Sequence, residues 1–201
     1  MLSVFIRLVH SCAAIAVAWI SVPPFIPAFA AEPAVDEQKI ASCRSCHGAD
    51  GNSPFENIPS LAAQPATYTG MQIFLYRTNQ RKIPEMNAAV AHLADRDVAD
   101  IAAYFERQKP SPPPEDADPG RMTRGQALAR QHHCDSCHLP NFAGQNQMPR
   151  LAGQREDYLV KAMRDYKSGM RAGFDGMMIA VLHPLDDAGI RELAYYLARL
   201  R

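Results

Sequence analysis

The sequence lacks an excess of charge, any run that alternates like a β-strand, and any long apolar run beyond its first 30 residues. Its 21 Lys+Arg balance 21 Asp+Glu, and neither half is basic enough to indicate binding to nucleic acid. Without alternating apolar and polar residues there is no signal for a β-sheet. We therefore expect an all-α chain with no transmembrane segment after the N-terminal region.

Residues 1–30 are typical of a secretory signal peptide. Arg7 lies in a short basic start, an apolar run follows up to Val22, and Ala28-Phe-Ala30 forms an A-x-A cleavage site. An uncleaved membrane anchor is the alternative, but the apolar run is short and prolines break it. We expect cleavage near Ala30 and export of a soluble chain to the periplasm, a compartment that permits disulfides.

A proline-rich stretch, KPSPPPEDADPG at residues 109–120, divides the exported chain in two. Its composition is typical of a stiff extended linker. The predicted first domain covers residues 31–108 and the predicted second domain residues 121–201. Each is small for a chain that must stabilise itself through its own core, so a covalent or bound staple is expected.

The two parts of the exported chain carry opposite charge. Residues 31–118 have 8 Lys+Arg and 13 Asp+Glu, whereas residues 119–201 have 12 Lys+Arg and 8 Asp+Glu. Such a dipole can orient a protein as it meets a charged partner. Scatter in surface charge explains the difference equally well.

The two domains repeat each other. The segment PSLAAQ at residues 59–64 returns 90 positions later as PRLAGQ at residues 149–154, and the tyrosines that follow keep this shift. The residues from Met86 onward match those from Met178 onward at a shift of 92. Small loop changes explain the drift in the shift, so internal duplication is the simplest interpretation.

Apolar periodicity predicts three helices in each domain. The expected helices cover residues 35–43, 67–79 and 95–108 in the first domain and 125–134, 156–167 and 186–200 in the second. Val98, Ile101 and Phe105 share one face of the third helix, at the spacing of a buried stripe. Asp95 and Asp187 suit the first turn of the last helix in each domain, where the helix dipole favours negative charge.

Four of the five cysteines lie in two clusters of one form, in which two residues separate two cysteines and a histidine follows: Cys43, Cys46 and His47 in the first domain, and Cys134, Cys137 and His138 in the second. This is the attachment signature of c-type haem. Two thiols on one helical turn can reach the two vinyl groups of a porphyrin while the next side chain faces the iron. We predict two covalently attached haem c groups, with both histidines as axial iron ligands.

Zinc, a redox dithiol and local disulfides all fit the clusters less well than haem. Zinc ribbons place their cysteine pairs roughly 15 to 20 residues apart, whereas these pairs lie in separate domains. A thioredoxin-like redox pair requires a βαβ setting, which is missing here. Local disulfides would be strained and would leave His47 and His138 unexplained. A porphyrin would also supply the missing core of each small domain.

Each iron then needs a sixth ligand or stays open for chemistry. The candidates are Met71, Met86 and His92 in the first domain and Met148, Met163, Met170, Met177, Met178 and His183 in the second. Only Met86 and Met178 match under the internal repeat, each in an expected loop ahead of the last helix. Core packing is the favoured role of Met71 and Met163 inside the middle helices. Met177 remains the main rival to Met178.

His132 and His133 precede the second cluster and raise the question of another metal site. Ala41 and Ser42 occupy the equivalent places in the first domain. We therefore interpret the two histidines as bystanders near the edge of the haem.

With two CxxCH motifs, paired methionines and a secretory signal in 201 residues, the chain resembles the dihaem cytochrome c4 family. Each half is similar to a class I cytochrome c domain. The resemblance implies two tandem all-α domains, each wrapped around one covalent haem. It also implies that Pro59 and Pro149 hold the axial histidines through their backbone carbonyls. The stretch before Met178 is two residues longer than the stretch before Met86, which bears on the second ligand of haem 2.

A histidine and a thioether fill the coordination sphere of the iron and raise its reduction potential, so the iron can change valence without binding a substrate. The resemblance accordingly implies an electron carrier, not an enzyme, that passes electrons to a respiratory terminal oxidase. Its partners would be redox proteins, such as a membrane-bound reductase or oxidase. Two alternatives stay open: an electron-transfer subunit of a periplasmic dehydrogenase, and a dihaem peroxidase with one open iron.

Overall fold

The computed structural model describes residues 36–171 and 176–201. The predicted signal peptide at residues 1–30, with its cleavage site near Ala30, lies outside the described residues. In the described part of the chain, no helix has both the length and the apolar character that a membrane span requires. Residues 33–201 form one unit, in which the two domains contact each other through hydrogen bonds.

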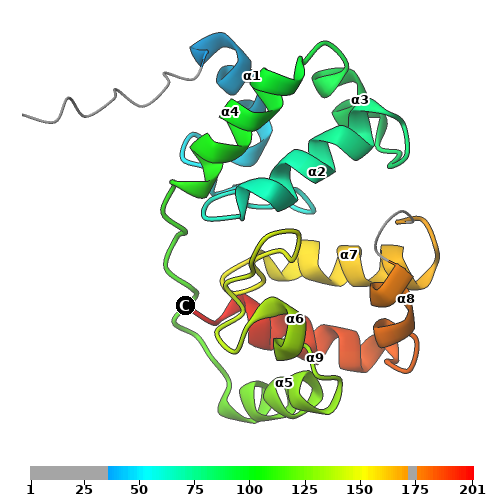
Figure 1. The fold of residues 1–201 in the computed structure, drawn as a ribbon. Coiled ribbons are helices and arrows are strands. Elements are labelled where there is room, and N and C mark those ends of the chain that lie inside the picture. Colours follow the sequence, from blue (N-terminus) through cyan, green and yellow to red (C-terminus); the bar gives the residue numbers. More distant parts are fainter. Residues whose placement is uncertain (1–35, 172–175) are drawn as a thin grey trace, which may run out of the picture. The chain divides into compact units, whose positions relative to one another are not determined.

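Residues 36–108 form four helices in the described chain: α1 (Glu37–His47), α2 (Ala66–Arg77), α3 (Pro84–Val90) and α4 (Asp95–Glu106) (Figure 1). α2 packs against α3 and α4, and α1 contacts α4. The predicted stripe of α4 is confirmed, because Val98, Ile101 and Phe105 are all buried. They pack with Ile40 of α1, which joins the helix carrying the first cysteine cluster to the core.

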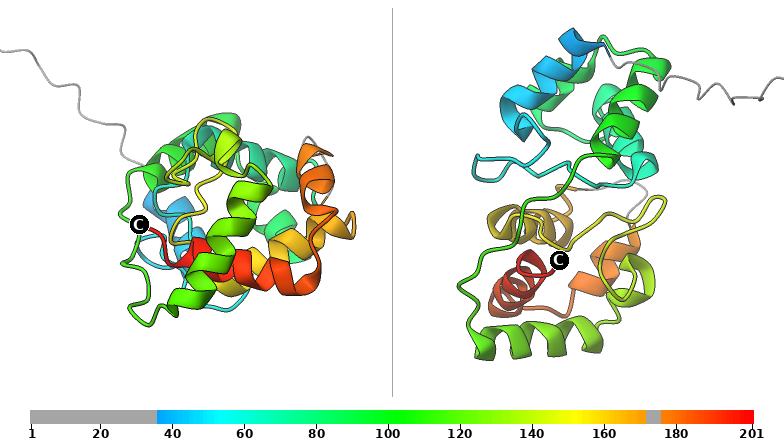
Figure 2. Two further views of the ribbon diagram at one scale, coloured as in Figure 1. Left: turned by 90° about the horizontal axis from the view of Figure 1, so that it is seen from below. Right: turned by 90° about the vertical axis from the view of Figure 1, so that its left-hand side faces the viewer.

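The described residues from 119 onward form five helices: α5 (Pro119–Gln131), α6 (Asp135–His138), α7 (Glu156–Lys167), α8 (Gly176–Leu182) and α9 (Asp187–Ala198). α9 packs against both α5 and α7, seven of its 12 residues are buried, and α5 lies across it (Figures 1 and 2). Gly125 of α5 permits this close approach, since a Cβ atom there would lie 2.3 Å from the Cβ atom of Tyr196. The Asp186 carboxylate caps α9 by accepting the Gly189 N–H at 2.7 Å.

The first helix of each domain differs from its predicted bounds. α1 continues through the whole first cysteine cluster to His47. The predicted helix 125–134 instead begins at Pro119, inside the predicted linker, because the Asp118 carboxylate accepts the Arg121 N–H at 2.7 Å and proline suits the first helical turn. It ends at Gln131, and His133 has a left-handed φ of 51°, which separates α5 from α6.

The methionine segments, expected as loops, are two short helices, α3 and α8. Pro84 begins α3, where its fixed φ is already helical and its missing N–H costs no hydrogen bond. Seven residues are too few to show a clear helical period, which is why the pattern suggested a loop. The prediction of an all-α fold is confirmed: among the described residues there is no strand, only an isolated bridge between Gln145 and Met148.

Candidate haem sites

The cysteines of both clusters are free thiols. Cys43 and Cys46 lie in the last turns of α1. Cys134 directly precedes α6, and Cys137 is a residue of α6. Burial raises the pKa of Cys43, and burial together with Asp135 raises the pKa of Cys134 to about 11. These two thiols are therefore protonated at neutral pH.

The two cluster histidines are buried and oriented in the same way. His47 is 6 % exposed and its Nδ1 lies 2.8 Å from the Pro59 carbonyl oxygen. His138 is 4 % exposed and its Nδ1 lies 2.9 Å from the Pro149 carbonyl oxygen. A carbonyl only accepts, so Nδ1 carries the proton in both rings and Nε2 is the atom with the lone pair for a metal. The expected contacts of both histidines with these proline carbonyls are confirmed.

Burial lowers the pKa of His47, and the hydrogen bond to Pro59 offsets only part of this effect. The imidazole is therefore neutral at neutral pH. A neutral, immobilised imidazole is the form that binds a metal.

The two predicted methionine ligands lie on the core side of their short helices. Met86 of α3 is half-buried against the core of the first domain. Met178 of α8 is half-buried against the core of the second. Met177, its rival, is 71 % exposed. The structure thus places a histidine and a methionine in each domain, His47 with Met86 and His138 with Met178.

The remaining candidate ligands occupy different environments. Met163 lies in the core of the second domain, as its predicted packing role requires. His92 and His183 are exposed. Met148 and Met170 are 37 % and 70 % exposed. None of these residues has a counterpart of the same type at the equivalent position of the other domain.

Two buried arginines lie outside the predicted sites. Arg81 is 7 % exposed and donates to the Gln72 Oε1 atom at 2.6 Å. Arg171 is 4 % exposed and donates to the Tyr68 hydroxyl at 2.8 Å. Continuing the 90-residue shift beyond the repeated tyrosines pairs Arg81 with Arg171, and this is the signal by which the sequence could have revealed them.

In the described part of the chain, the acceptors that contact these arginines are a side-chain amide and tyrosine hydroxyls. Among the described residues, no carboxylate forms an ion pair with Arg81 or Arg171, and the Arg171 Nε is buried without a hydrogen-bond partner. Burial alone would raise the pKa of the Tyr158 hydroxyl, but Arg171 and Arg81 outweigh it and lower this pKa to about 8. Buried cations require compensating anions. Each haem c brings two propionate carboxylates, so the residues present fit that group.

Comparison with known proteins identifies the family. The cytochrome c family model matches residues 37–109 and 122–201. Cytochrome c4 of Pseudomonas aeruginosa is 35 % identical over 85 % of this chain and 90 % of its own length. The crystal structure of reduced recombinant cytochrome c4 from Pseudomonas stutzeri superimposes with a TM-score of 0.76 at 34 % identity, covering 82 % of this chain and 96 % of that one.

A further relative carries a more specific name. The thiosulfate dehydrogenase electron acceptor of Thiomonas intermedia is 30 % identical over 79 % of this chain and 78 % of its own length. Both family-model matches lie in the helical domains described above. The chain therefore belongs to the cytochrome c family, as a tandem two-domain member of the cytochrome c4 type, a dihaem electron carrier and not an enzyme.

Proposed function

We propose that each domain binds one haem c through its own cysteine cluster. The proposed thioether anchors are Cys43 and Cys46 for haem 1 and Cys134 and Cys137 for haem 2, and the proposed iron ligands are His47 with Met86 and His138 with Met178. The observation that carries the proposal is the repeated hydrogen bond from histidine Nδ1 to a proline carbonyl, at 2.8 and 2.9 Å. It fixes the tautomer in which Nε2 can bind iron.

Arg81 and Arg171 are proposed to hold the haem propionates. Both guanidiniums are buried, and each stacks over a tyrosine ring, Tyr76 at 4.7 Å and Tyr166 at 4.4 Å. Arginine presents a planar fork of donors that matches a carboxylate. The stacking would hold each fork in place for the carboxylates of a porphyrin.

The proposed ligands would close the haem iron to substrates. Haem supplies one-electron redox chemistry when bound, and the ligand pair decides how it is used. A histidine and a methionine would hold the iron in each domain, and with both bound the iron would have no free position for a substrate. Methionine ligation and a buried apolar surround raise the reduction potential. This combination suits a carrier that accepts and releases single electrons.

We further propose that the carrier works in the periplasm and delivers electrons to a respiratory terminal oxidase, with a membrane-bound reductase as a donor. The signal-like N-terminal sequence and the resemblance to cytochromes c4 support this assignment. The opposite charge of residues 31–118 and 119–201 would orient the protein at each partner.

A second candidate is electron acceptance from a periplasmic dehydrogenase. The similarity to the thiosulfate dehydrogenase electron acceptor of Thiomonas intermedia favours it. The two candidates differ in the donor and share the same haem ligation. Both are electron-carrier functions.

Absorption spectroscopy tests the ligands, and kinetics tests the partner. The ferric protein should show the weak red band of iron bonded to methionine sulfur with an intensity for two haems, and neither haem should take up carbon monoxide readily. Reduced protein mixed with membranes containing a terminal oxidase should then be oxidised in a salt-dependent reaction. Rapid reduction by thiosulfate dehydrogenase without oxidation by membranes would favour the second candidate. A high-spin haem would contradict the ligand assignment.

A further inference from the structure

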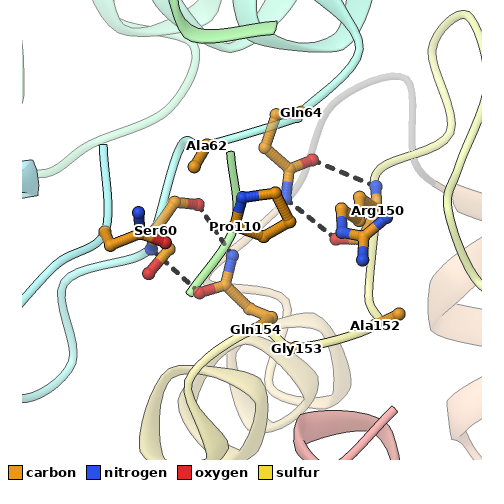
Figure 3. A pocket seen from close by; sticks show the side chains of 9 residues that line it. Ser60, Ala62, Gln64, Pro110, Arg150, Ala152, Gly153 and Gln154 are labelled. Atoms are coloured by element: carbon orange, nitrogen blue, oxygen red, sulfur yellow. Dashed lines mark hydrogen bonds between the residues drawn. The ribbon is translucent and has the colours of Figure 1, made fainter. Parts of the chain in front are cut away.

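Two buried glutamines connect the domains in a reciprocal way (Figure 3). Gln154 of the second domain contacts Ser60 of the first, accepting its N–H at 2.9 Å and donating to its carbonyl at 2.8 Å. Gln64 of the first domain contacts Arg150 of the second, accepting its N–H at 3.0 Å and donating to its carbonyl at 2.8 Å. Gln64 is 4 % exposed and Gln154 is 6 % exposed, so water does not compete for these bonds.

Each glutamine accepts the N–H of one particular peptide group in the other domain. The Gln154 Oε1 atom also accepts the Arg155 N–H of its own domain at 3.0 Å. The Ser60 N–H belongs to the same peptide group as the Pro59 carbonyl, which accepts the His47 Nδ1–H at 2.8 Å. In the second domain the Arg150 N–H shares its peptide group with the Pro149 carbonyl, the acceptor for His138. A continuous chain of two hydrogen bonds therefore runs from each glutamine across the domain boundary to an axial histidine.

Such a chain is polarised along its length. When the N–H of a peptide group donates to an acceptor, its carbonyl oxygen becomes more negative and accepts more strongly, so consecutive hydrogen bonds reinforce each other in a buried site. A stronger bond from Nδ1–H makes the imidazole a more basic ligand. A more basic ligand stabilises ferric iron and lowers the reduction potential of that haem.

We propose that Gln154 and Gln64 are positioning residues that act across the boundary. Gln154 of the second domain tunes the reduction potential of haem 1 through His47, and Gln64 of the first domain tunes haem 2 through His138. This inference rests on the proposed haem ligation. It adds that each domain completes the histidine environment of its neighbour, so that the docking of the domains and the two potentials are linked.

The geometry supports a tuning role beyond simple docking. Other hydrogen bonds across the boundary do not involve the Pro59–Ser60 and Pro149–Arg150 peptide groups. The Arg155 guanidinium donates to the Ser53 carbonyl at 3.0 Å, and Asp157 accepts the Asn57 N–H at 2.9 Å. Among the described residues, only the glutamines address the two peptide groups that hold the histidines. The pairs are equivalent under the 90-residue repeat, so the crossed arrangement occurs twice.

The test uses the complete holoprotein and two variants of similar shape, Gln154→Met and Gln64→Met. Methionine fills a similar volume and removes the acceptor. The potential of each haem is followed separately during a redox titration through its assigned paramagnetic NMR signals. We expect Gln154→Met to raise the potential of haem 1 alone and Gln64→Met to raise that of haem 2 alone. Each variant serves as the matched control for the other, because the same substitution should leave the potential of the other haem unchanged.

Arg155→Lys provides a third variant, which keeps the charge while weakening a contact across the boundary away from the histidines. It should leave both potentials unchanged. Equal shifts of both haems in either glutamine variant, a shift of the haem in the variant's own domain, or no shift at all would overturn the proposal. An equal shift of both haems in Arg155→Lys would also overturn it, since loosening of the boundary would then explain the effect.

Two measurements keep the outcome clear. The red methionine band of the unaltered protein is recorded first, so that wrong ligands are recognised independently of the glutamines. If Gln154→Met fails to load haem, Gln154→Glu preserves an acceptor oxygen for the Ser60 N–H. That variant should not raise the potential of haem 1. A rise in Gln154→Glu would contradict the role of the acceptor.

Discussion

Replacement of Gly125 by alanine tests the close crossing of α5 and α9. The added Cβ would lie 2.3 Å from the Cβ atom of Tyr196 and 2.5 Å from the Glu192 carbonyl oxygen. Carbon atoms in ordinary contact lie about 3.5 to 4.0 Å apart. The helices would therefore have to move apart by more than about 1 Å to bring the two Cβ atoms to that separation. Both obstacles lie close to the α9 backbone, so neither can rotate away.

Overpacking of this kind costs about 1 to 3 kcal/mol, and alanine regains about 0.5 to 1 kcal/mol of helix propensity relative to glycine. Because a contact of 2.3 Å is far shorter than ordinary contact, the cost lies in the upper part of that range, about 2 to 3 kcal/mol. With a gain of about 1 kcal/mol from helix propensity, the expected net loss of unfolding free energy is about 1 to 2 kcal/mol. For a domain of this size, each kcal/mol corresponds to roughly 4 to 8 °C in the melting temperature. The second domain should therefore melt earlier by roughly 5 to 15 °C.

Gly70 in α2 offers a matched control for the same substitution. The nearest heavy atom to a Cβ added there is the Val98 Cγ1 at 3.8 Å, which is ordinary van der Waals contact. Gly70→Ala should therefore be stabilising, by about 0.5 to 1 kcal/mol from reduced backbone entropy. One substitution is thus expected to have opposite signs at two helical positions.

Thermal unfolding of the holoproteins, followed by far-UV circular dichroism and by the Soret band, measures both effects. The melting temperature should fall for Gly125→Ala and rise for Gly70→Ala. A Gly125→Ala protein as stable as the original would refute the reasoning, because it would mean that the helices separate at no cost. Destabilisation by Gly70→Ala would show that the two positions do not differ as the distances indicate.

Three further predictions concern the haem sites. Met178→Ala should convert haem 2 alone to a high-spin or lower-potential form. Met177→Ala should leave the absorption spectrum unchanged, because Met177 is 71 % exposed. The opposite pattern would make Met177 the ligand. Replacement of Cys134 and Cys137 together should leave one covalent haem, which mass spectrometry of the intact protein would detect. Retention of two covalent haems would contradict the proposed attachment sites. In the proposed holoprotein the His47 Nε2 atom cannot take up a proton while it binds iron, whereas an imidazole released on unfolding has the ordinary pKa of about 6.5. Stability should therefore fall as the pH drops below about 6.5; denaturant titrations at several pH values measure this, and constant stability over that descent would argue against it.

Much of the fold could be predicted because its signals are local. The stripe of Val98, Ile101 and Phe105 repeats at helical spacing, and the structure buries all three. The middle helix of the second domain has the predicted bounds, Glu156–Lys167. The short helix α8 was missed since its seven residues are too few to show a period. The break at His133 depends on a left-handed backbone conformation that the residue type does not reveal.

The sequence predicts the chemistry of the sites, because two CxxCH clusters, the duplication and the matched methionines depend on spacing along the chain, which tertiary contacts do not alter. Which groups share a buried environment follows only from the packed structure. It gathered Arg81 and Arg171 away from described carboxylates, and it joined Gln154 to the peptide group that holds His47. That contact spans 94 positions in sequence. The exclusion of water strengthens it, and this exclusion is a property of the packed molecule that no local pattern encodes.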